Sequence, residues 1–167
     1  MTTAVVRRPV RLFISFAERD WSDVSALLDL LKPQLAISRR IDPVLWASHP
    51  DLRTGDDFQA EIFHRIATCD YALWMVSPSF LSSQFIRDHE IPPFVGPSRR
   101  VPGLPVGLHP VPLDGTADLQ GIEALEIFKL NKAKWFSQCR TAAERREFCA
   151  ALAAQLRSVI DPPSTTW

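Results

Sequence analysis

Short apolar runs alternate along this chain with longer segments in which apolar residues recur every three or four positions. A continuous apolar run of about six residues is typical of a strand buried in a parallel sheet, and the longer spacing is typical of a helix that packs on such a sheet. We therefore expect strands at 10–16, 43–48 and 71–76, and helices at 21–35 and 58–66 between them.

The second half of the chain is less regular. A strand-like run at 106–113 contains prolines, which suit the edge of a sheet. The segment 122–130 is either a short helix or an irregular return, and 134–136 is either a short last strand or a loop that packs two aromatic side chains. A last helix is expected after Thr141, which forms a capping box with Glu144.

Strands and helices that alternate in this way predict a single α/β domain. The expected architecture is flavodoxin-like, an open parallel sheet of about five strands with helices on both faces. The domain is expected to span 10–160. Residues 1–9 are read as an N-terminal tail, and residues 161–167 as a C-terminal tail or the start of a linker to a further module.

Composition excludes several kinds of partner. Lys and Arg together number 19, as do Asp and Glu, so no overall basic field favours direct binding to nucleic acid or to an acidic membrane surface. No apolar run is long enough to span a bilayer. The three cysteines and four histidines lack metal-ligand spacing, and the cysteine usage fits a reducing cytosol. We expect a cytoplasmic protein without a metal.

The residues that follow the expected strands argue against three classes of α/β protein. No Gly-rich loop joins a strand to a helix, which argues against a P-loop protein or a Rossmann dehydrogenase. A response regulator needs an acidic cluster after its first strand and a phosphorylatable aspartate after its third. Here Ser15-Phe16 and Ser77 occupy those places, which disfavours that class as well.

The segment 77–90 holds the clearest candidate for chemistry. It follows the third expected strand, and ligands of open α/β sheets bind beyond the carboxyl ends of the strands. If Ser79 or Ser82 caps a helix there, Glu90 lies near its last turn and shares a face with Ser83. From the residues alone, Glu90 is either a solvated helix residue or a functional carboxylate.

Three blocks of sequence, taken in order, resemble the TIR (Toll/interleukin-1 receptor) domain family. Residues 12–16 with Asp20 resemble its first box, residues 51–58 with Ile62 resemble its BB loop, and residues 77–90 resemble its αC region. Each block is short, but their order and spacing together are specific. The resemblance covers nearly the whole expected domain.

The resemblance implies one of two functions. Many bacterial and plant TIR domains cleave NAD+ at the nicotinamide–ribose bond, whereas others are adaptors that only self-associate. Similarity to the bacterial NAD-cleaving type implies an NAD+ glycohydrolase or cyclase that uses NAD+ as substrate, needs no cofactor and is activated by TIR–TIR self-association. Its role would be in antiphage defence or signalling, with a fused or associated sensor module. The alternative is a non-catalytic TIR–TIR interaction module.

The catalytic glutamate of the family matches Glu90. The family commonly places this residue four positions after an aromatic residue, whereas Phe85 lies five positions before Glu90, so His89 and Asp88 are the neighbouring alternatives. A single carboxylate suits this reaction, because nicotinamide leaves as a neutral molecule and needs no general acid, unlike the leaving group of an ordinary glycoside.

The same blocks imply positions that bind the substrate. Trp46 matches an aromatic residue that stacks on nicotinamide, or is a core or rim residue. Arg19 either pairs with a pyrophosphate or is solvated. The implied substrate-binding residues are Ser15, Phe16, Arg19, Asp20, Trp46, Leu52, Arg53, Ser77, Phe80 and Ser83, and the BB-loop residues expected at an oligomer interface are Leu52, Arg53, Thr54 and Gly55.

Overall fold

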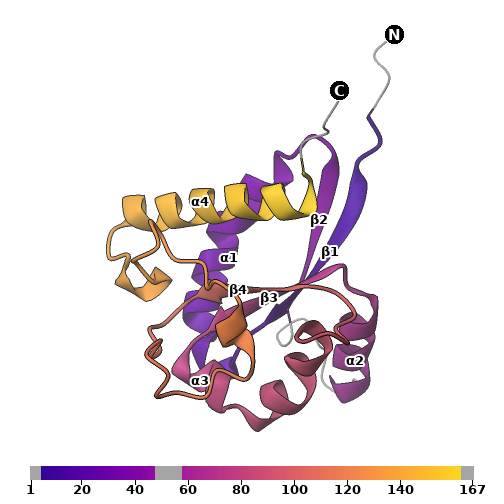
Figure 1. The fold of residues 1–167 in the computed structure, drawn as a ribbon. Coiled ribbons are helices and arrows are strands. Elements are labelled where there is room, and N and C mark those ends of the chain that lie inside the picture. Colours follow the sequence, from indigo (N-terminus) through magenta and orange to yellow (C-terminus); the bar gives the residue numbers. More distant parts are fainter. Residues whose placement is uncertain (1–4, 48–57, 163–167) are drawn as a thin grey trace.

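A computed structural model describes residues 5–47 and 58–162 (Figure 1). Four parallel strands form one sheet in the spatial order β2-β1-β3-β4. The strands are β1 (Arg8–Ser15), β2 (Ile41–Ala47), β3 (Tyr71–Val76) and β4 (Gly103–Gly107).

The expected open parallel sheet is confirmed, with four strands in the described ranges rather than about five. Beside β4, a single parallel bridge joins Val106 to Phe128. Phe128 therefore lies where a fifth strand would continue the sheet. The rest of the segment 122–130 contains a 3-10 turn at Ile122–Ala124 and an isolated antiparallel bridge from Leu130 to Lys134, and is otherwise irregular. Residues 134–136 form a loop that buries two aromatic side chains, one of the two alternatives left open above.

The limits of the fourth strand were predicted wrongly. β4 ends at Gly107 because the next two residues, Leu108 and His109, both donate their backbone N–H to the carbonyl of Val76 at the end of β3. It begins at Gly103, where the ring of Trp74 occupies the space that a Cβ would need. The third strand, in contrast, has the predicted limits.

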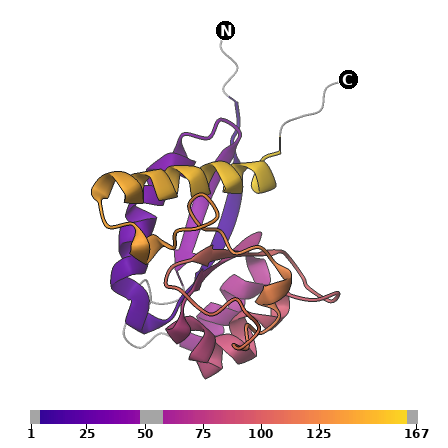
Figure 2. The same ribbon diagram turned by 60° about the vertical axis from the view of Figure 1, so that its left-hand side comes forward.

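Helices cover both faces of the sheet, as predicted (Figures 1 and 2). The helices α1 (Trp21–Ala36) and α4 (Ala142–Ile160) pack on one face. The helices α2 (Phe58–Thr68) and α3 (Pro78–Ser82) lie on the other face, together with the π-helical turn η2 (Ile86–Glu90). The cap of the last helix is also confirmed, since Thr141 Oγ1 accepts a hydrogen bond of 3.1 Å from Glu144 N–H.

Alternate residues of the strands divide the core into two clusters. In β1, Leu12 and Ile14 face α1 and α4, whereas Phe13 faces the opposite layer together with Trp74 of β3. This alternation is the ordinary consequence of the two-residue period of a strand. The candidate carboxylate lies in the layer that contains Phe13 and Trp74.

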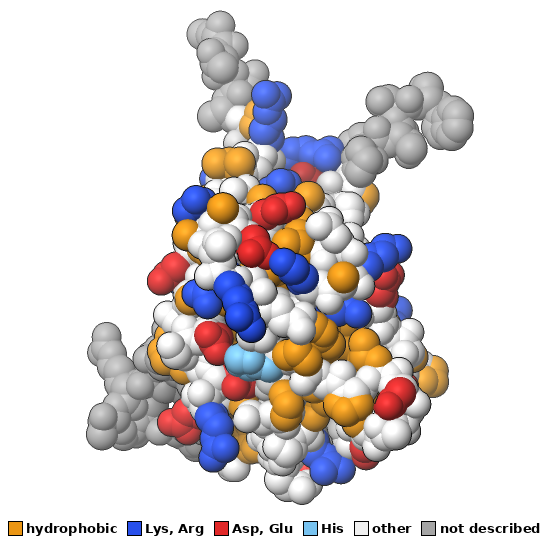
Figure 3. All heavy atoms as spheres, turned by 90° about the vertical axis from the view of Figure 1, so that its left-hand side faces the viewer, with side chains coloured by type: hydrophobic (Ala, Val, Ile, Leu, Met, Phe, Trp, Pro, Cys, Tyr) orange, Lys and Arg blue, Asp and Glu red, His pale blue; other side chains and the backbone are white. Residues whose placement is uncertain are grey.

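The surface matches the balanced composition where it is visible. On the face shown in Figure 3, basic and acidic side chains are interspersed rather than gathered by sign. Within residues 5–47 and 58–162, no helix has the length and apolarity needed to cross a bilayer.

Candidate active site

The carboxyl end of β1 meets the end of η2. Ser15, the last residue of β1, donates a hydrogen bond of 2.5 Å from Oγ to Glu90 Oε2. Both residues are buried, with exposed fractions of 0% and 1%. The other carboxyl oxygen, Glu90 Oε1, is also buried and has no hydrogen-bond partner in the described part of the chain. One oxygen is therefore held, and the other is unsatisfied.

The turn that delivers Glu90 is π-helical. Ile91 N–H donates to the carbonyl of Ile86, five residues earlier, at 3.0 Å. Trp74 Nε1 donates to the backbone carbonyl of Glu90 at 3.3 Å, which links the turn to β3. π-helical turns are rare and often occur at functional sites.

The start of this segment is positioned by a cap that was predicted wrongly. Ser77, rather than Ser79 or Ser82, is the N-cap of α3, and its Oγ accepts a hydrogen bond of 3.0 Å from Phe80 N–H. The Ser77 hydroxyl also donates to Asp20 Oδ2. This short contact ties the polar loop after β1 to the loop after β3.

His109, which follows β4, extends this polar chain. Its Nε2 lies 2.8 Å from Asp23 Oδ2 and 3.9 Å from Asp20 Oδ1. Polar groups that follow β1, β3 and β4 are thus joined at the carboxyl ends of these strands. The sequence pattern did not indicate this role, because His109 fell inside the strand predicted at 106–113, whereas β4 ends at Gly107.

Burial dominates the electrostatics of Glu90. It raises the pKa of the Glu90 carboxyl from 4.5 to about 7, because a charged carboxylate loses its hydration inside the protein. The hydrogen bond from Ser15 acts in the opposite direction and favours the ionised form. Near neutral pH the carboxyl is consequently divided between its two protonation states, a property common among catalytic groups.

Burial also distinguishes Glu90 from its neighbours. Asp88 is exposed, and its Oδ1 accepts a hydrogen bond of 2.8 Å from Gln84 Nε2. His89 is exposed and places its ring 4.9 Å from that of Phe85. Of the three adjacent candidates, only Glu90 contacts Ser15.

A cleft of about 600 Å³ opens next to the Ser15–Glu90 pair. Phe16, which follows Ser15 in the chain, and Ile86, which lies in the same turn as Glu90, line the cleft. Ser15 and Glu90 themselves are not among its described lining residues. Three of the expected substrate-binding residues, Phe16, Arg19 and Ser83, line it. The described lining is Phe16, Ala17, Glu18, Arg19, Gln59, Ser79, Ser82, Ser83, Phe85 and Ile86.

Other expected site residues lie elsewhere. Phe80, a residue of α3, is fully buried. Trp46 is half-buried in β2, with the guanidinium carbons of Arg11 and Arg65 at 5.6 and 6.0 Å from its ring centre. It is not among the described residues that line the cleft. The BB-loop positions Leu52, Arg53, Thr54 and Gly55 lie outside the described residues.

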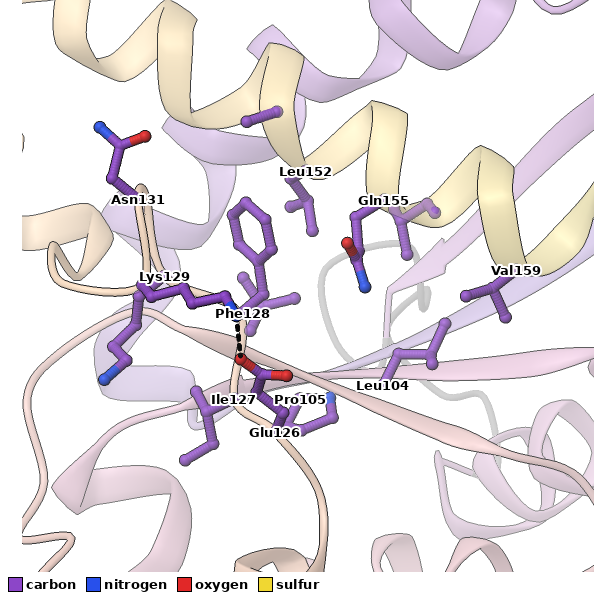
Figure 4. Close-up of a pocket in the computed structure, with 14 residues that line it drawn as sticks. Leu104, Pro105, Glu126, Ile127, Phe128, Lys129, Asn131, Leu152, Gln155 and Val159 are labelled. Carbon is purple, nitrogen blue, oxygen red and sulfur yellow. Dashed lines mark ion pairs between the residues drawn. The ribbon is translucent and has the colours of Figure 1, made fainter.

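A second hollow lies on the opposite face of the sheet, between β4, the segment 126–132 and α4 (Figure 4). Its volume is about 430 Å³ and its walls are largely apolar, with an ion pair of 3.9 Å between Lys132 and Glu126. It contains none of the expected site residues. In the part of the chain that the structure describes, no three His, Cys, Asp or Glu side chains could hold a metal ion together.

Comparisons with known proteins do not identify a family for this chain. No model of a known protein family matches the sequence, and a search of curated proteins finds no match. The resemblance to TIR domains thus depends on the three sequence blocks alone.

Proposed function

We propose that this protein is an NAD+ glycohydrolase or cyclase of the TIR type, with Glu90 as its charged catalytic group. The observation that carries the proposal is the Glu90 carboxyl itself. It is buried beside a cleft at the carboxyl ends of the strands, Ser15 holds one of its oxygens, and the other oxygen lacks a partner. Burial of a carboxyl oxygen without a hydrogen-bond partner lowers the stability of the fold, and such exceptions in native proteins often have a functional reason.

The chemistry needs one carboxylate in its ionised form. When the bond between C1′ of the ribose and the nicotinamide nitrogen breaks, the electron pair returns to the pyridinium ring and nicotinamide leaves neutral. Positive charge develops on the ribose, and an adjacent carboxylate stabilises it. Water that attacks C1′ gives ADP-ribose and a proton, and attack by an adenine nitrogen gives a cyclic product. In this scheme Ser15 holds Oε2 and leaves Oε1 for the ribose.

Access to the carboxyl requires a movement. Glu90 is only 1% exposed, and Ile86 of the same turn lines the cleft. In our proposal, self-association shifts the segment 83–90 and exposes Oε1 to NAD+. A fused or associated sensor module would trigger this step in a cytoplasmic defence or signalling response, a role that the TIR resemblance alone supports.

The burial of Glu90 also favours a second candidate function. If the Ser15–Glu90 pair is only a structural tether, the carboxyl stays buried and never meets a substrate. The protein is then a non-catalytic TIR–TIR interaction module. The two candidates differ in whether nicotinamide is released.

The test is nicotinamide release from NAD+ by concentrated protein, followed by chromatography. Glu90→Gln keeps the size of the side chain and an oxygen that accepts from Ser15. We expect it to lower the rate at least about 100-fold, because the charge is lost. Asp88→Asn, a change in an exposed carboxylate two residues away, is the matched control.

Equal rates in the wild type and Glu90→Gln would refute the catalytic role. No release by a wild type that demonstrably self-associates would favour the interaction module. Mass spectrometry of the product distinguishes ADP-ribose from a cyclic isomer.

A further inference from the structure

Three aromatic rings from two separate segments form a cluster at the surface. The rings are those of Phe63 in α2, Phe85 just before η2, and His89 within η2. The centre of the Phe63 ring lies 6.3 Å from that of Phe85, nearly parallel at 16°, and 5.2 Å from that of His89. Phe63 is 42% exposed, and among the described residues it is the only exposed large apolar side chain that is aromatic.

The cluster is continuous with the cleft beside Glu90. Phe85 belongs to both, because it contacts the other two rings and also lines the cleft. Gln59 lines the cleft one helical turn before Phe63, so its amide lies on the same face of α2. His89 directly precedes Glu90 in the chain. The cleft thus extends from the neighbourhood of the carboxyl to an aromatic surface with an amide beside it.

This combination of groups fits a purine base. Aromatic faces stack on the π-face of a nucleobase, and an amide side chain presents a donor and an acceptor that match N6 and N7 of adenine. The cleft volume of about 600 Å³ is within the range of small-molecule sites.

We propose that Phe63, Phe85 and His89, with Gln59, form the subsite for the adenine ring of the dinucleotide. This assignment rests on the function proposed above for Glu90. It places the adenine at the α2 end of the cleft and the nicotinamide ribose at the Glu90 end. Arg19, which lines the cleft, is then available for the pyrophosphate between them.

The first experiment compares NAD+ with nicotinamide mononucleotide, which has the scissile bond but no adenine. We expect Phe63→Ala to lower the ratio of kcat/KM for NAD+ to that for the mononucleotide about tenfold, the size of one lost base–aromatic stack. Phe63→Tyr keeps the ring and should keep the ratio. Ile37→Ala changes a 74% exposed apolar residue that follows α1, and should leave the ratio unchanged. An unchanged ratio in Phe63→Ala would overturn the assignment.

The second experiment separates the subsite from catalysis. Adenosine monophosphate is titrated into the wild type and Phe63→Ala by calorimetry, and we expect the variant to bind about tenfold more weakly. Binding by a wild type that releases no nicotinamide would support the subsite and refute the catalytic proposal. Nicotinamide release without binding of adenosine monophosphate would support the catalytic proposal and refute the subsite. Loss of self-association in Phe63→Ala, with equal nucleotide affinity, would overturn the subsite and assign the cluster to a protein interface.

Discussion

The buried carboxyl of Glu90 is the most unusual side-chain group in this structure. Glu90 has lost its hydration and gained one hydrogen bond, from Ser15, in exchange. The balance favours the protonated form in the folded protein, with a pKa of about 7. The unfolded chain, in contrast, ionises this residue near its ordinary value of 4.5.

The stability of the protein should therefore depend on pH through Glu90. Between about pH 4.5 and pH 7 the unfolded chain releases the Glu90 proton while the folded protein keeps it, so the free energy of unfolding falls as the pH rises. Below this window both states are protonated, and above it both are ionised. Compared with Glu90→Gln, the wild type should lose on the order of 3 kcal/mol across the window.

Urea unfolding of both proteins between pH 4 and pH 8 measures this difference. Comparison with the variant removes the contribution of the other titrating groups. Two curves that remain parallel through the window would show that the pKa of Glu90 is not raised.

At the scale of elements, the short helix α3 depends on one hydroxyl. Ser77 accepts from Phe80 N–H and donates to the buried carboxylate of Asp20. A five-residue helix has little stability of its own, so its ends must be fixed by the surrounding structure. The cap also sets the direction in which the chain leaves β3 toward Glu90.

Ser77→Ala should lower the free energy of unfolding by about 1–3 kcal/mol. The change removes a cap and leaves Asp20 Oδ2 without its hydroxyl donor. Ser158→Ala is the control, because its exposed hydroxyl donates to the Gln155 carbonyl within the same helix, α4, and a change below about 0.5 kcal/mol is expected. Chemical denaturation measures both. Equal losses of unfolding free energy in the two variants would mean that the Ser77 cap does not stabilise the fold.

The elements show how far pattern alone can predict this fold. The strand at Tyr71–Val76 was predicted in full because it is buried on both faces and reads as one apolar run. β4 was misplaced because Gly103 and Pro105 are typical of a loop. Gly103 is required by the ring of Trp74, which comes from a strand far away in the sequence. Such a tertiary contact leaves no local signal.

Two residues of the candidate site were named from the sequence, but their geometry was not. Ser15 and Glu90 were both expected at the carboxyl ends of the strands, yet nothing in the sequence indicated that they would bond to each other or be buried together. The helical spacing used for the prediction was α-helical, and the actual turn is π-helical. The aromatic cluster around Phe63 was missed because its three rings come from two segments.

At the scale of the whole molecule, the sheet separates two cores. The cluster beneath α1 and α4 contains Leu152, whereas the cluster beneath α2 and α3 contains Trp74 and lies next to Glu90. The first cluster borders the candidate site at Phe16, which also lines the cleft. The second contributes both stability and the position of Glu90.

Leu152→Ala should therefore separate stability from activity. Leu152 is buried in α4, and its truncation should cost about 2–5 kcal/mol. The rate of nicotinamide release per folded molecule should be unchanged, because the sheet lies between this residue and Glu90. Leu113→Ala, in an exposed residue, is the control for stability. A rate that falls in proportion to the lost stability would show that the two faces are coupled.

The π-helical turn at Ile86–Glu90 has the length of an α-helical turn with one inserted residue. The bond from Ile91 N–H to the Ile86 carbonyl spans five residues where an α-helix spans four. The extra residue is accommodated as a bulge, and the carboxyl still reaches Ser15. The five-residue separation of Phe85 and Glu90 is thus compatible with a family pattern of four. An alignment that allows no gap in this turn would assign the role proposed for Glu90 to His89.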